Sequence, residues 1–193
     1  NAWDDDETND EQWPYRVKFS GTDLLGNVTI PEGAPTDVET SLEVSLDASS
    51  ESYPLHTFNL LNEGVMQKIA VAFKMQPSEI AAATLDDATV KADGFNGPAE
   101  GKVAVGLTNP NGSISYAYSA NGIGFWIAED GSAGTWGDGT KIYFEYNSGA
   151  YGLTVGHKPG ATEKGKTYTI KPTMVYNKDG KLHKAVITIK MKY

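Results

Sequence analysis

Residues 121–147 read Asn-Gly-Ile-Gly-Phe-Trp-Ile-Ala-Glu-Asp-Gly-Ser-Ala-Gly-Thr-Trp-Gly-Asp-Gly-Thr-Lys-Ile-Tyr-Phe-Glu-Tyr-Asn and hold two of the four tryptophans of the chain. A short apolar run around Trp126 ends at Glu-Asp-Gly, and residues 142–146 form an aromatic-rich strand pattern. Glycines surround Trp136 between these two segments. The stretch therefore predicts two strands joined by a loop, and loops on a rigid sheet often carry binding residues. We expect a binding site here rather than a catalytic one.

The alternation of apolar and polar residues recurs along most of the chain and predicts further strands. A strand at 15–19 is expected to pair with 28–30 as a hairpin, and the remaining strands are expected at 42–46, 53–60, 102–107, 114–118, 151–155, 167–170, 174–176 and 182–193. Turn sequences such as Asn109-Pro-Asn-Gly separate several of them. Many short strands without a repeated βαβ unit indicate a mainly β protein, an antiparallel β sandwich.

One segment, at about residues 62–85, breaks this alternation. Its apolar residues recur at helical spacing from Val65 to Phe73, with Asn62 as the expected N-cap. Pro77 suits the first turn of a second helix that continues through Ile80. We therefore expect one inserted two-helix unit that covers an edge or end of a sheet. DNA-reading helix pairs have a similar outline, but a chain with a net charge of −9 and no basic second helix lacks the attraction to phosphate. No nucleic-acid partner is predicted.

The composition divides the chain and limits its chemistry. Residues 4–11 contain six acidic residues and no basic one, so residues 1–12 are expected to be an acidic flexible tether and residues 13–193 the β-sandwich domain. Nine lysines lie between residues 158 and 193, a pattern that favours solubility of exposed strands. No cysteine is present, which excludes disulfides and thiolate metal sites. His56, His157 and His183 are too scattered to specify a metal and are interpreted as surface or packing residues.

Several short motifs follow one another in the order Pro77-Ser-Glu-Ile, Ala120-Asn-Gly, Gly124-Phe-Trp, Trp136-Gly-Asp, Phe144-Glu145, Val155-Gly156 with Pro159-Gly160, Gly165-Lys-Thr-Tyr-Thr and Tyr176-Asn177. In these motifs the chain, from about residue 53 onward, resembles a domain-of-unknown-function family found in surface lipoproteins and glycan-utilisation proteins of gut Bacteroidetes. Ile127 and His157 depart from the family pattern, which has a second aromatic residue or aspartate and a glutamine there.

The resemblance implies an exported, non-catalytic, uncharacterised domain associated with carbohydrates. It also implies attachment to the outer membrane or cell surface through a lipid-modified cysteine placed before the acidic tether. We accordingly expect contact with a membrane only through such an N-terminal lipid anchor.

Four carboxylates flank the two tryptophans: Glu129, Asp130, Asp138 and Glu145. Two carboxylates about 5 to 10 Å apart would suit glycoside hydrolysis. However, Glu129-Asp130-Gly and Gly-Asp138-Gly are ordinary turn sequences, and Glu145 alternates outward from its strand. Neither loop has the spacing of a calcium-binding loop. We therefore predict no enzyme activity, no metal and no cofactor.

Sugar binding needs flat aromatic faces and a few polar groups. The candidates are Trp136, Tyr116, Tyr118 and Tyr151, with Asp138 and Asn147 as partners for hydroxyls. A core position is favoured for Trp126, whereas Trp136 fits a core or an exposed position equally. We predict a non-catalytic, exported surface domain that binds an oligo- or polysaccharide through a platform centred on Trp136.

The alternative function is a structural or adhesive surface protein that makes protein–protein contacts. Such a protein would accept a strand from a neighbour at an unpaired sheet edge. The C-terminal strand is the expected edge.

Overall fold

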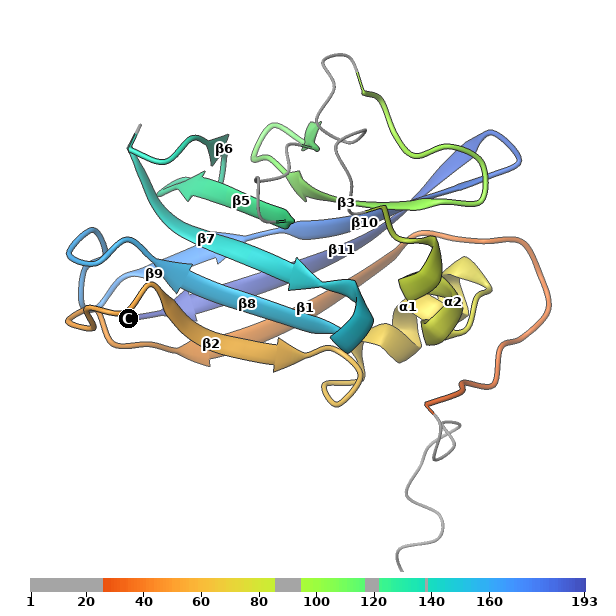
Figure 1. Ribbon diagram of the computed structural model, residues 1–193, viewed down its shortest axis with the longest axis horizontal. Coiled ribbons are helices and arrows are strands. Elements are labelled where there is room, and N and C mark those ends of the chain that lie inside the picture. The colour runs from red at the N-terminus through yellow and green to blue at the C-terminus, as the bar shows by residue number, and fades with distance from the viewer. Residues whose placement is uncertain (1–25, 86–94, 117–121, 138) are drawn as a thin grey trace, which may run out of the picture.

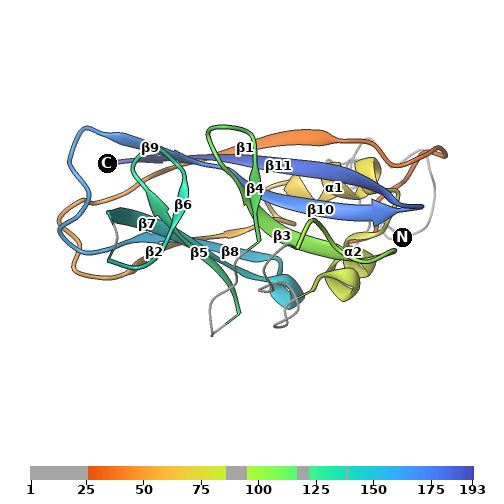
Figure 2. The same cartoon turned by 90° about the horizontal axis from the view of Figure 1, so that it is seen from above.

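The computed structural model describes residues 26–85, 95–116, 122–137 and 139–193, in which two β-sheets pack face to face (Figures 1 and 2). The six-stranded sheet contains β1 (Val38–Ser45), β3 (Val103–Thr108), β4 (Ile114–Ser115), β9 (Thr167–Ile170), β10 (Pro172–Lys178) and β11 (Lys181–Lys192). The five-stranded sheet contains β2 (Pro54–Asn59), β5 (Ile123–Ala128), β6 (Ala133–Gly134), β7 (Thr140–Asn147) and β8 (Gly152–His157). The predicted β sandwich with a small helical insertion is confirmed.

One strand pair departs from the predicted antiparallel arrangement. The strand orders are β1-β11-β10-β3-β4, with β9 also beside β11, and β2-β8-β7-β5-β6. β1 runs parallel to β11, so that Val38 lies opposite Ala185 and Ser45 opposite Lys192. Parallel neighbours need a crossover rather than a tight turn, and most of the chain lies between these two strands.

The C-terminal strand β11 is central in its sheet, and the prediction that it forms a free edge is wrong. β1 pairs with one side of β11, while β10 and β9 share the other side. Alternate residues of β11 from His183 to Met191 are buried. The outer strands of the six-stranded sheet are β1, β4 and β9, which pairs with β11 alone among the described strands, so the strand-accepting alternative loses its expected edge.

The two helices, α1 (Val65–Phe73) and α2 (Pro77–Ala83), lie together at one end of the sandwich (Figure 1). The predicted apolar face is buried, from Val65 to Phe73 on α1 and at Ile80 on α2. Asn62 is not the N-cap, because Gly64 precedes α1 with a φ of 76°, a left-handed conformation that suits glycine. Pro77 occupies the first turn of α2 as expected. None of the described helices is long and apolar enough to cross a membrane.

The N-terminal end of α2 holds the segment that precedes β1. The backbone N–H of Val28 donates to Gln76 Oε1 at 2.8 Å, and Gln76 Nε2 donates to the carbonyl of Val28 at 2.9 Å. Residues 28–30 form no continuous strand: Val28 lies in a single β-bridge, and its backbone N–H and carbonyl bond the Gln76 side-chain amide. The predicted hairpin with residues 15–19 stays a prediction. The strand predicted at 15–19 and the tether predicted at 1–12 lie outside the described residues.

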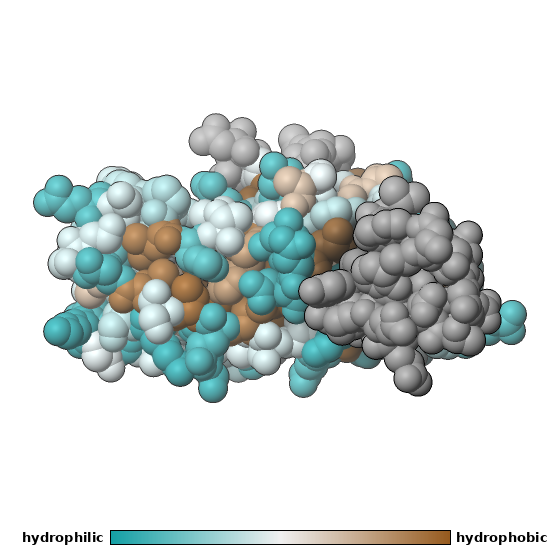
Figure 3. Space-filling model, turned by 90° about the horizontal axis from the view of Figure 1, so that it is seen from below, coloured by the Kyte–Doolittle hydropathy of each residue, from teal (hydrophilic) through white to brown (hydrophobic). Residues whose placement is uncertain are grey.

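The core between the sheets continues into the helical end, where Phe73 lies 5.4 Å from Tyr176, centroid to centroid. On the side where β1 and β2 are the outer strands, apolar side chains also reach the surface between polar ones (Figure 3). Of the surface and packing roles that the sequence left open for His157, the structure shows the packing role. Its ring is buried, hydrogen-bonds Thr162 Oγ1 at 2.8 Å and the Ser50 carbonyl at 2.9 Å, and stacks on Tyr193.

Candidate functional site

Trp136 lies in the turn between β6 and β7 and exposes 57% of its surface. Gly137 and Gly139 have φ values of 91° and 74°, which glycine adopts without steric cost. Lys158 Nζ lies 5.0 Å from the centroid of the indole, a cation–π contact that orients the ring. Of the two positions that the sequence left open, Trp136 therefore takes the exposed one.

The structure does not bring Asn147 and Tyr151 to Trp136. β7 begins at Thr140, close to the Trp136 turn, and ends at Asn147. At about 3.3 Å per residue these ends lie about 23 Å apart. Tyr151 follows Asn147 across the 3-10 turn η3 (Ser148–Ala150) and packs against the core at the helical end (Figure 1). Both residues sit at the opposite end of the sheet from the predicted platform.

Tyr116 belongs to the other sheet. It follows β4, is half-buried, and meets Phe95 edge to face with 5.0 Å between ring centroids. Burial raises the pKa of Tyr116. Tyr118 and Asp138 lie outside the described residues. Of the predicted site residues that the structure describes, only Trp136 lies in the turn between β6 and β7.

A second aromatic group lies on the outer face of the five-stranded sheet. Trp126 is opposite Tyr143 across β5 and β7, and Tyr143 is opposite Gly156 across β7 and β8. Because side chains alternate along a strand, these three positions face away from the core. Tyr143 is nevertheless only 6% exposed, because its neighbours on the outer face cover it. Phe125 and Phe144, the next residues on β5 and β7, are buried and stack on each other inside the sandwich at 5.1 Å.

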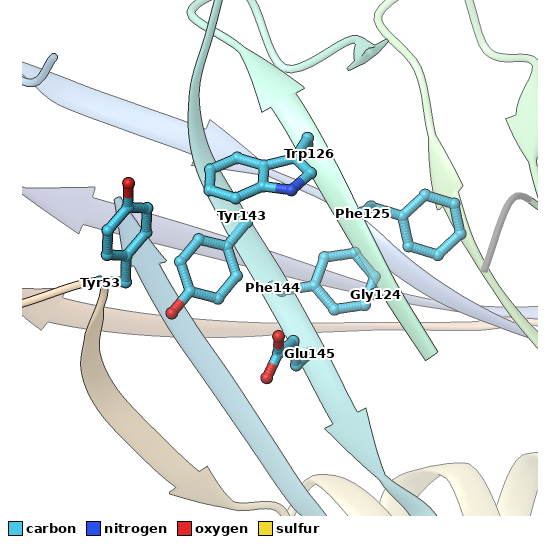
Figure 4. A pocket seen from close by; sticks show the side chains of 7 residues that line it. All are labelled: Tyr53, Gly124, Phe125, Trp126, Tyr143, Phe144 and Glu145. Atoms are coloured by element: carbon cyan, nitrogen blue, oxygen red, sulfur yellow. The ribbon is translucent and has the colours of Figure 1, made fainter. Parts of the chain in front are cut away.

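Tyr53 completes this group, which we call the outer-face aromatic cluster: Tyr53, Trp126 and Tyr143. The Trp126 ring lies 5.0 Å from the ring of Tyr143 and 6.3 Å, edge to face, from that of Tyr53, centroid to centroid. Figure 4 shows the rings side by side, with Glu145 below the pair of Trp126 and Tyr143. A Cβ atom at Gly156 would lie 2.6 Å from Tyr143 Cε1 and closer still to the Tyr53 carbonyl oxygen. The Tyr143 ring can therefore pack against β8 only because residue 156 is a glycine.

A hollow of about 130 Å³ opens beside the cluster (Figure 4). Gly124 lies two residues before Trp126 on the same face and is opposite Glu145, so the lack of a side chain there leaves space between them. Trp126 and Tyr143 line the hollow together with Glu145. Burial, and after it the charge of Glu145, raises the pKa of Tyr143 to about 12. Drug-sized ligands occupy about 300 to 1,000 Å³, so this hollow takes a single small group.

Polar residues border the cluster on both sides along the strands. Thr154, opposite Glu145, shares a 2.8 Å hydrogen bond with Thr57 on β2. Toward the other end of the strands, Glu129 accepts a hydrogen bond from Lys166 at 2.7 Å and lies 3.6 Å from Lys141. The bond to Lys166 holds the pKa of Glu129 below its ordinary value.

Asp130 has the turn role that its sequence indicated. Its carboxylate accepts hydrogen bonds from the backbone N–H and the hydroxyl of Ser132, and these bonds lower the pKa of Asp130. Both Glu129 and Asp130 therefore stay ionised at neutral pH, the form that cannot donate a proton to a leaving group. In the part of the chain that the structure describes, no three His, Asp or Glu residues are grouped so that they would hold a metal ion.

Sequence reasoning missed the outer-face aromatic cluster. It favoured a core position for Trp126, which is instead half-buried on the outer face, because Phe125 and Ile127 take the inward positions of β5. The alternation within β7 does mark Tyr143 and Glu145 as facing the same way, and the outward position predicted for Glu145 is confirmed. Tyr53 joins them only through the pairing of β2 with β8, which no local pattern reveals.

The family described as "Domain of unknown function (DUF4859)" matches residues 52–181, well over half of the chain. This range includes the outer-face aromatic cluster, the hollow and Trp136. No curated protein and no solved structure shows a significant match.

Proposed function

We propose that this chain, which belongs to the DUF4859 family, is a non-catalytic domain that binds an oligo- or polysaccharide along the outer face of its five-stranded sheet. The observation that carries the proposal is the exposed indole of Trp136 at the end of a sheet face that also presents the half-buried Trp126, which packs on the buried Tyr143. Flat aromatic surfaces accommodate the C–H faces of pyranose rings, and nearby polar groups orient the hydroxyls.

Lys158 connects the two aromatic regions. Lys158 lies two residues beyond Gly156, so its side chain projects from the same face of the sheet as the Gly156 position, about 7 Å further along the strand. Its ammonium group contacts the Trp136 ring. An elongated ligand that stacks on Trp136 would therefore continue over Lys158 toward Trp126, which favours a chain of sugars over a single ring.

We also propose that the domain works outside the cell, lipid-anchored at the outer membrane or cell surface, as in the Bacteroidetes lipoproteins that it resembles. One feature of the sequence supports this location: the acidic residues 4–11 have the composition of a spacer between an anchor and a domain.

The test is binding of the purified protein to an array of plant, host and bacterial polysaccharides, followed by calorimetry on the best ligand. Trp136→Ala should weaken that affinity about ten- to a hundredfold, because stacking on one aromatic face is worth roughly 1 to 3 kcal/mol by analogy with nucleic-acid bases. Leu182→Ala is the matched control, since it also removes an exposed apolar side chain but from the six-stranded sheet.

The Trp136→Ala variant should keep the melting curve of the wild type, because the side chain is largely exposed. Unchanged affinity in this variant would show that the ligand binds elsewhere. Absence of binding to every polysaccharide on the array would refute the proposed function.

A further inference from the structure

We infer that the hollow beside Gly124 receives a protonated amine, so that the carbohydrate bound by this domain is an amino sugar polymer with free ammonium groups. This inference rests on the proposed function and adds the chemical class of its ligand. It is carried by the combination of two aromatic walls and one carboxylate, Trp126, Tyr143 and Glu145, around a space for one small group.

The walls of the hollow favour a cation. The faces of indole and phenol rings attract ammonium groups, and a tryptophan face does so most strongly. Trp126 and Tyr143 are opposite each other, with ring centroids 5.0 Å apart and planes inclined at 51°, and both line the space at Gly124. Trp126 offers the accessible aromatic surface, because Tyr143 is only 6% exposed and supports the indole from beside it. The two rings belong to neighbouring strands of one sheet, which keeps this geometry fixed before a ligand arrives.

The rim of the hollow carries a carboxylate that the described protein does not neutralise. Glu145 is exposed, lies opposite Gly124, and makes no ion pair with any residue in the described ranges. An ionised carboxylate only accepts hydrogen bonds. It therefore pairs best with a group that only donates and is positively charged, which is the description of an alkylammonium. Acidic sugars would meet repulsion at the same position.

The lysines of this face lie too far from Glu145 to change this conclusion. Lys141 and Lys158 are each four residues along the strands from Glu145 and its opposite residue Thr154, about 13 Å away. This distance exceeds the Debye length of about 8 Å at physiological ionic strength. Lys141 is also engaged by Glu129, and Lys158 by the Trp136 ring. At the Trp136 end of the sheet face Lys141 and Lys166 are paired with Glu129 and Glu163, whereas Glu145 has no such cation beside it among the described residues.

The experiment compares two probes that differ in one substituent: a tetramer of glucosamine with free amines and its fully N-acetylated counterpart. Calorimetry at a pH where the amines are protonated should show the wild type binding the free-amine tetramer about tenfold more tightly, the scale of one cation–π and carboxylate contact. Glu145→Gln, which keeps the shape of the side chain but removes its charge, should reduce this preference to the part that the Trp126 ring contributes.

A control variant distinguishes a specific contact at Glu145 from general attraction between a cationic ligand and an acidic protein. Glu39→Gln changes the net charge equally, at an exposed position on β1 of the other sheet, and should keep the tenfold preference. Equal affinities for the two tetramers in the wild type, or an undiminished preference in Glu145→Gln, would overturn the inference.

The failure of this inference is distinct from the failure of the proposed function. Trp136-dependent binding of neutral polysaccharides without preference for the free amine would refute the amino sugar alone. Absence of binding to any carbohydrate would refute both.

Discussion

Replacing Gly156 by alanine is the sharpest test of how the outer face of the five-stranded sheet is built. The added Cβ atom would lie 2.6 Å from Cε1 and Cζ of Tyr143 and closer still to the carbonyl oxygen of Tyr53. That oxygen accepts a hydrogen bond from the backbone N–H of His157 at 3.0 Å. Neither obstacle is the flexible end of a long side chain, so relief requires movement of a packed ring and of the backbone before β2.

The expected loss is about 2 to 3 kcal/mol in the free energy of unfolding. Overpacking costs typically about 1 to 3 kcal/mol, and two rigid neighbours place this site at the upper end. The lower conformational entropy of unfolded alanine offsets about 0.4 to 1 kcal/mol of that cost. Gly152 on the same strand is the matched control, because its added Cβ atom would meet only Thr57 Cγ2 at 3.8 Å. Neither glycine has a positive φ, so backbone strain is equal in the two variants.

Urea denaturation followed by tryptophan fluorescence measures both variants. Gly152→Ala should fall within about 1 kcal/mol of the wild type, on the stabilising side, while Gly156→Ala should lower the denaturation midpoint with an unchanged slope. If Gly156→Ala were as stable as Gly152→Ala, Tyr143 would not lie against β8 as described. The described geometry of the hollow, which depends on the position of Tyr143, would then be wrong as well.

Three further outcomes are expected. Phe73→Ala should cost roughly 3 to 5 kcal/mol in the free energy of unfolding, since this fully buried ring packs on Tyr176; a loss below about 1 kcal/mol would contradict the packing of α1. Deletion of residues 1–12 should leave the melting temperature within about a few degrees of the wild type, and a larger drop would show that the acidic segment packs. The folded state raises the pKa of Tyr143 to about 12, above the ordinary value of about 10, and so favours the neutral phenol. The resulting stability is complete below about pH 10 and declines as the pH rises toward 12. The difference between the ultraviolet titrations of the wild type and Tyr143→Phe should therefore show the missing phenol ionising near pH 12, and a difference centred near pH 10 would refute the shift.

The sequence by itself determined which residues of each element face inward. Period-two alternation marked β7, with Ile142 and Phe144 inside and Glu145 outside, and helical spacing marked the buried face of α1. These patterns are local, because the geometry of a strand or helix fixes which neighbours share a face. The fold class followed from them, as did the turn role of Asp130.

Only the tertiary structure decided which strands are neighbours. β1 joins β11 in parallel, with Val38 opposite Ala185, and this pairing makes the C-terminal strand central rather than an edge. In the other sheet, the pairing of β2 with β8 brings Tyr53 to Trp126 and Tyr143, while the length of β7 separates Trp136 from Asn147. Alternation is identical in a central strand and an outer one with one buried face, so it carries no information about the partner. The candidate site depends on those partners, and for this reason the sequence located its exposed indole turn but not the aromatic cluster beside it.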